Sequence, residues 1–171
     1  MLRRFKSVPA VLIRAGEASN PSSPAIGETE ERLRMAALLK SRTLSVSINC
    51  DPGRVYEFVS KPENLPKWAK MFCRSIKKSN GKWIAETPQG PVKVRFTGKN
   101  NFGVLDHYVN PGPGVEVFVP MRVVPNASGS EVLLTLFQLA GMSDEKFAED
   151  IGWVRQDLRT LKGIMGLRKG A

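Results

Sequence analysis

The end of the chain carries an apolar stripe with helical spacing, and this stripe constrains the fold more than any other feature. Ser143 can cap such a helix, and Asp144 and Glu145 suit the positive end of its dipole. A long amphipathic helix must cover an apolar surface, so the preceding residues have to supply one. The members of the stripe recur at steps of three and four residues: Phe147, Ile151, Val154, Leu158, Leu161 and Met165.

The preceding residues supply that surface as short strands. In the first strand, Leu44, Val46 and Ile48 alternate with polar residues, which is the period of a strand with one buried face. Turn residues separate the later runs, and Asn80-Gly81 predicts a tight hairpin. Seven strands are predicted, over residues 43–49, 72–79, 82–87, 91–98, 103–109, 115–124 and 131–140.

Two short helices are predicted between the first two strands, over residues 52–61 and 62–70. The first begins at Asp51-Pro52, where aspartate can cap the helix and proline suits its first turn. The order is thus one strand, two short helices, six antiparallel strands and one long helix. This order predicts an α+β fold in which a sheet wraps around the final helix.

The N-terminal part predicts little fixed structure. Residues 1–28 begin with basic residues and continue with Ser, Pro, Asn and Gly, which indicates a flexible basic tail. A short helix is predicted over residues 29–41, and the folded domain over 42–167. Residues 1–16 lack acidic side chains, so an organellar transit peptide is the alternative to a cytoplasmic protein. A true start at Met35 would instead place the upstream residues outside the native protein.

The net charge of +10 is spread along the chain. Residues 1–42 hold eight basic and four acidic side chains, against eighteen and twelve in the remainder. Neither a basic helix with interleaved aromatic residues nor a nucleic-acid-binding motif accompanies the excess. We therefore expect a solvated basic surface without specific nucleic-acid binding, and peripheral membrane contact stays open.

Apolar runs and cysteine spacing limit the remaining classes of protein. A membrane-spanning helix needs about 18 or more apolar residues, and charged residues, Gly or Pro interrupt every long apolar run of this chain. The sequence therefore predicts a soluble protein without a transmembrane segment. Cys50 and Cys73 lack the CxxC spacing, and the chain has one histidine, whereas a tetrahedral metal site needs about four such ligands. We expect free thiols in the cytoplasm, no metal and no cofactor.

Two segments carry a resemblance to a known family. "INCDPGRVYEFVSKPENLPKW" (48–68) and "GMSDEKFAEDIGWVRQDLRTLKGIM" (141–165) resemble the START and polyketide cyclase superfamily, also called SRPBCC, over residues 40–167. "FGVLDHYV" and "VFVPMRVVPN" are similar to an uncharacterised bacterial branch of it. The resemblance implies the helix-grip fold, a curved seven-stranded antiparallel sheet around a C-terminal helix. It also implies an elongated cavity between them for lipids, quinones, polyketides or other apolar molecules.

The single histidine, His107, follows Asp106 within the predicted strand 103–109. Successive residues of a strand point to opposite faces, so a direct Asp106–His107 catalytic pair is not expected. Leu105 and Val109 share the more apolar face with His107, which favours an imidazole that points inward. There it would either hydrogen-bond to a neighbour or fix the polar end of a ligand.

The leading hypothesis is a protein that binds or carries a small hydrophobic ligand between sheet and helix. One alternative is a cyclase, aromatase or dehydratase-like enzyme in which His107 transfers a proton. Another is a protein-interaction module with a collapsed cavity. Ligand identity and oligomeric state stay open. The predicted ligand-binding residues are His107, Trp83, Val94, Phe96, Val117, Val119, Met121, Phe147, Ile151, Val154 and Leu158.

Overall fold

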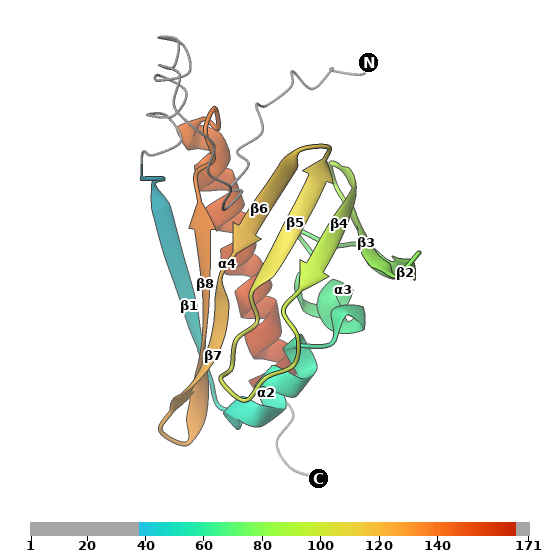
Figure 1. Ribbon diagram of the computed structural model, residues 1–171. Coiled ribbons are helices and arrows are strands. Elements are labelled where there is room, and N and C mark those ends of the chain that lie inside the picture. The colour runs from blue at the N-terminus through green and yellow to red at the C-terminus, as the bar shows by residue number, and fades with distance from the viewer. Residues whose placement is uncertain (1–37, 167–171) are drawn as a thin grey trace, which may run out of the picture.

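The computed structural model describes residues 38–166 and confirms the α+β class (Figure 1). Strand β1 (Ser41–Ile48) precedes helix α2 (Pro52–Val59), the 3-10 turn η1 (Pro62–Asn64) and helix α3 (Leu65–Trp68). Helix α4 (Asp144–Gly166) ends the described chain. Between α3 and α4 lie β2 (Ser75–Ser79), β3 (Lys82–Thr87), β4 (Gly90–Phe96), β5 (His107–Gly112), β6 (Val115–Val119), β7 (Met121–Asn126) and β8 (Gly129–Phe137).

The predicted tail over residues 1–28 lies outside the described residues, as does most of the predicted helix over 29–41. The last part of that helix prediction is wrong. Residues 38–40 have no regular structure, and Ser41 already begins β1.

The prediction of one seven-stranded sheet is wrong, because the strands form two antiparallel sheets. Their orders are β1-β8-β7 and β2-β3-β4-β5-β6. The predicted strand 115–124 is interrupted at Pro120, which has no N–H to donate to a strand ladder. Before the proline, β6 pairs with β5; after it, β7 pairs with β8. The Pro120 carbonyl accepts a hydrogen bond from Thr135 N–H at 2.9 Å, so one stretch of chain passes from sheet to sheet.

The predicted strand 103–109 also differs, since β5 begins only at His107. The residues before it hydrogen-bond to β7: Leu105 N–H donates to the Met121 carbonyl, and Val123 N–H donates to the Gly103 carbonyl, each at 2.9 Å. Gly103 has a φ of +68°, and a Cβ there would overlap the Val123 carbonyl oxygen. Only glycine meets both requirements without strain.

The two main helices begin as predicted. Asp51 Oδ1 accepts a hydrogen bond from Arg54 N–H at 3.0 Å at the start of α2, and Ser143 Oγ accepts one from Lys146 N–H at 3.2 Å at the start of α4. Helix α4 packs against β1 and α3. In Figure 1 it runs lengthwise beside the three-stranded sheet, while β4, β5 and β6 slant away from it.

One hydrophobic core joins both sheets to α2, α3 and α4. Its members include Val55 on α2, Trp68 on α3, Val132 on β8 and Leu161 on α4. Cys50 and Cys73 are buried and free, as predicted. No helix within residues 38–166 is long and apolar enough to cross a membrane.

Candidate functional site

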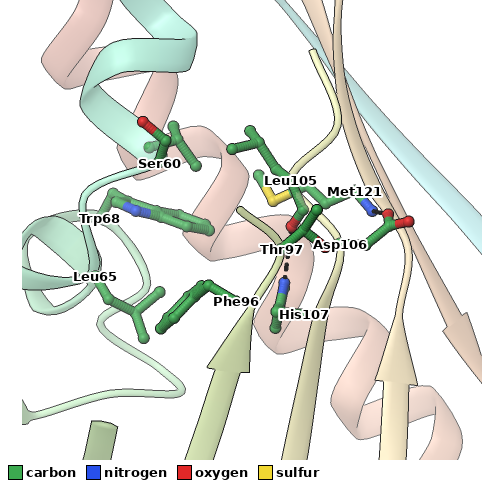
Figure 2. A pocket seen from close by; sticks show the side chains of 10 residues that line it. Ser60, Leu65, Trp68, Phe96, Thr97, Leu105, Asp106, His107 and Met121 are labelled. Atoms are coloured by element: carbon green, nitrogen blue, oxygen red, sulfur yellow. Dashed lines mark hydrogen bonds between the residues drawn. The ribbon is translucent and has the colours of Figure 1, made fainter. Parts of the chain in front are cut away.

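A narrow pocket lies between the α2–α3 segment and the ends of the central strands (Figure 2). Its volume is about 20 Å³, and about 10–15 Å³ on this measure is enough for one water molecule. This pocket therefore has room for about one small group. The lining residues are Val59, Ser60, Leu65, Trp68, Phe96, Thr97, Leu105, Asp106, His107 and Met121.

One wall of this pocket depends on the turn between α2 and α3. The buried Asn64 side chain donates a hydrogen bond from Nδ2 to the Phe58 carbonyl at 2.8 Å. This bond ties η1 to the end of α2, and Leu65 and Trp68 follow directly on α3. The opposite wall comes from the end of β4, the start of β5 and the first residue of β7.

Trp68 lines the pocket and also contains an unpaired hydrogen-bond donor. The residue is 4% exposed, and its Nε1–H is buried without a hydrogen-bond partner in the described part of the chain. An unpaired buried donor costs about 1–3 kcal/mol relative to a paired one. Any group that brings an acceptor to this N–H recovers that free energy.

His107 lines the same pocket. Its half-buried ring lies with Nδ1 3.2 Å from the Leu105 carbonyl oxygen. A carbonyl can only accept, so Nδ1 carries the proton, and Nε2 has the free lone pair of a neutral ring. Burial lowers the pKa of His107, although the Leu105 hydrogen bond and the Asp106 charge oppose that shift. The imidazole is therefore neutral at pH 7.

The Asp106 carboxylate contacts β7 and not the His107 ring. Its Oδ1 accepts a hydrogen bond from Met121 N–H at 2.9 Å and pairs with the Arg122 guanidinium. The Asp106 backbone carbonyl accepts from Thr97 N–H at 2.9 Å. These contacts hold the start of β7, and so Met121, against the pocket. The carboxylate does not orient the His107 ring, as the strand alternation indicated.

Three of the predicted ligand-binding residues line this pocket: His107, Phe96 and Met121. The other predicted residues lie elsewhere. Val94, Val119, Phe147 and Leu158 are buried, whereas Trp83, Val117, Ile151 and Val154 are half-buried.

Sequence reasoning missed the α2–α3 wall. Leu65 and Trp68 fall within the predicted helix 62–70 and are absent from the predicted ligand-binding residues. Their signal is that they are the large apolar residues of an otherwise mostly polar segment. The neighbouring hydroxyl of Ser60 and the side chain of Val59 complete this wall.

A buried carboxylate supports this wall from behind. Asp157 on α4 is 4% exposed, and its Oδ1 accepts a hydrogen bond from Met71 N–H at 2.9 Å. Burial raises the pKa of Asp157 to about 6, although hydrogen bonds from the Met71 and Phe72 backbone lower it in part. Burial likewise raises the pKa of the adjacent Cys73 thiol to about 11. Asp157 thus holds the chain just after Trp68 against α4.

Within residues 38–166, no three His, Cys, Asp or Glu side chains gather in a way that could hold a metal ion. The polar chemistry of the pocket is therefore that of Trp68, His107, Asp106 and two hydroxyl side chains, Ser60 and Thr97.

No protein-family model matches the chain, and no curated protein matches its sequence. Solved structures do match it. XoxI from Bacillus cereus is 21% identical with a TM-score of 0.61, and the match covers 74% of this chain and 96% of that one. Ara h 8.0201 is 15% identical with a TM-score of 0.57, covering 74% and 97%. DynU16, from the dynemicin biosynthetic locus, is 14% identical with a TM-score of 0.57, covering 72% and 46%. This chain therefore has the same fold as these structures, the helix-grip fold.

Proposed function

We propose that this protein binds a small, largely hydrophobic molecule at the pocket between α3 and the β4–β5 end of the sheet. The observation that carries the proposal is the mostly apolar lining of this pocket, which includes the side chains of Leu65, Trp68 and Phe96. Apolar side chains would supply affinity, and a few polar groups would fix the orientation of the ligand.

The size of the pocket sets a condition on this function. At about 20 Å³ it takes one small group, so the body of a ligand fits only after lining side chains move apart. Met121 is unbranched and adaptable, and Phe96 is only half-buried, so these two can move at the lowest cost. Leu65 and Trp68 move together with α3 if the whole wall shifts.

The alternative of a cyclase-like enzyme needs a second acid or base that acts together with His107. Asp106 is the other titratable residue in the lining, and its Oδ1 is engaged by Met121 N–H and Arg122. This arrangement favours binding over proton transfer.

Native mass spectrometry of the gently purified full chain tests the proposal directly. We expect a small molecule to be retained, or an apolar probe such as naphthalene to bind in a titration followed by calorimetry. The variant Trp68→Phe keeps an aromatic ring but removes the N–H, and it should lower the affinity for a retained molecule that carries an acceptor. Trp153→Phe is the matched control, because Trp153 lies under the Lys146 ammonium, 4.3 Å from it, outside the pocket lining. A chain that retains nothing and binds no apolar probe would rule out the proposed function.

A further inference from the structure

The outer face of the five-stranded sheet, which points away from the pocket, gathers basic and aromatic side chains from neighbouring strands. Arg95 and Tyr108 belong to this face, because they alternate along β4 and β5 with the pocket residues Phe96 and His107. We propose that the outer face binds single-stranded nucleic acid without sequence preference. Phosphates would pair with its lysine and arginine side chains, and bases would stack on its planar groups.

Three planar side chains lie side by side on the outer face. Tyr108 stands opposite Arg95 on β4 and opposite Phe118 on β6, and Figure 1 shows these strands next to one another. The Arg95 guanidinium lies 3.9 Å from the centroid of the Tyr108 ring, and the Tyr108 and Phe118 centroids are 5.0 Å apart. The Arg95 side chain is 64% exposed and Phe118 is 38% exposed. Both offer accessible planar groups of the kind on which unpaired bases stack.

Basic side chains from two further strands extend this surface. Lys77 on β2 and Lys93 on β4 are both paired in the strand register with Ile84 on β3, so all three share the outer face. Lys82, two residues before Ile84, belongs to the same face. All three lysines are exposed and can reach the phosphates of a bound strand.

The acidic side chains of the outer face leave it with an excess of positive charge. Glu86 and Glu116 stand against four basic residues of the same five strands. Glu116 pairs with Arg95 at 3.1 Å, but the pair is exposed, and such pairs contribute only about 0–1 kcal/mol, so a phosphate can replace the carboxylate. Just before β5, Asp106 pairs with Arg122 and adds no net charge.

A single strand fits this face better than other anionic partners do. A duplex keeps its bases inside the stack, so it would engage the basic side chains and leave the planar groups without a partner. Docking on an anionic membrane favours apolar side chains that insert into the bilayer, whereas the Tyr108 ring is half-buried between Arg95 and Phe118. The contributing strands span residues 75–119, so these side chains form a surface only in the folded sheet and no contiguous sequence motif.

Fluorescence anisotropy with a labelled twelve-residue oligothymidine tests the proposal on the full chain at low salt. An abasic strand of the same length carries the same backbone charge without bases, and a twelve-base-pair duplex carries bases that cannot stack on the protein. We expect oligothymidine to bind at least about tenfold more tightly than either, because each stacked base contributes about 1–3 kcal/mol. Equal binding of the abasic strand or the duplex would overturn the proposal, as would failure of oligothymidine to bind. Oligothymidine binding that vesicles of phosphatidylcholine and phosphatidylserine abolish by competition would assign the face to membranes instead.

Two exposed residues of the outer face separate stacking from charge. Phe118→Ala should weaken oligothymidine binding about fivefold or more and leave binding of the abasic strand unchanged. Phe102→Ala is the matched control, since Phe102 is 84% exposed and lies outside the strands of this sheet. An affinity for oligothymidine in Phe118→Ala equal to that of Phe102→Ala would contradict the stacking role.

Lys93→Gln should weaken both strands alike and reduce the slope of log affinity against log salt by about 0.7, the value for one phosphate contact on a single strand. Lys40→Gln is the charge-matched control, because Lys40 pairs with Asp144 away from the sheet. The same salt slope in both variants would refute the phosphate contact. These measurements are independent of the proposed function, because the pocket residues point to the opposite side of the strands.

Discussion

Replacing Asp157 with asparagine should remove a specific pH dependence of stability. The folded state raises the pKa of this carboxyl from 3.8 to about 6, chiefly through burial. The folded protein therefore binds the proton more tightly than the unfolded chain, and the associated stability is fully present below pH 3.8 and lost as the pH rises through about 6. A shift of about two pKa units corresponds to about 3 kcal/mol over the whole titration.

Asparagine is a suitable replacement because its Oδ1 can still accept the hydrogen bond from Met71 N–H, now without a charge to desolvate. Urea unfolding followed by circular dichroism would give the free energy of unfolding of both proteins between pH 4 and pH 7.5. We expect the wild type to lose about 2–3 kcal/mol relative to Asp157→Asn over this range. Groups that titrate equally in both proteins cancel in the difference.

Asp144→Asn is the control for this experiment, since Asp144 lies at the start of the same helix and its hydrogen bonds with Lys40 and Gln138 lower its pKa. The wild type should not lose stability relative to this variant as the pH rises. If the difference for Asp157→Asn is flat from pH 4 to pH 7.5, the carboxyl is not desolvated as the structure indicates, and its role behind the pocket wall has to be reconsidered.

Three further substitutions test the packing around the pocket. Met121→Ala and Met165→Ala each remove a side chain that is 2% exposed, and each should cost about 2–5 kcal/mol in urea unfolding. Calorimetry should show tighter naphthalene binding for Met121→Ala and not for Met165→Ala, because Met121 lines the pocket and Met165 does not. Gly103→Ala should lower the unfolding free energy by about 1–3 kcal/mol, since its positive φ and the nearby Val123 carbonyl exclude a Cβ; an unchanged midpoint would show that the loop has rearranged. Asn64→Ala should cost about 1–2 kcal/mol in urea unfolding and weaken naphthalene binding. A loss of stability with unchanged binding would show that the α2–α3 turn does not support the site.

Sequence alternation predicted the faces of the strands better than their partners. The inward positions Val117, Val119, Met121 and Val123 continue in step through Pro120, so the run looks like one strand. What changes at the proline is hydrogen bonding, because β6 pairs with β5 and β7 pairs with β8. The alternation of apolar and polar side chains does not indicate which neighbouring strand a segment pairs with. The division into two sheets could therefore not be predicted from this alternation.

The helix stripe was likewise predicted correctly as a packing surface. The predicted ligand cavity between the sheet and α4 stays a prediction, since the pocket described here is lined by α2, α3 and strand ends. Its α3 wall depends on two hydrogen bonds between a side chain and the backbone. The Asn64–Phe58 bond is local in sequence, and the Asp157–Met71 bond is long-range. Such contacts leave no periodic trace in a sequence, because each depends on the position of a single polar side chain in the folded chain.

The two walls of the pocket are held with different strength, and this difference indicates how a ligand enters. The β4–β5 wall is fixed by strand ladders and by the Asp106 contacts to β7. The α3 wall carries the unpaired Trp68 N–H and rests on the desolvated Asp157 carboxylate, and both features lower its stability at neutral pH. Segments that open locally are those with the fewest favourable interactions to lose. We therefore expect opening to occur on the α3 side of the pocket.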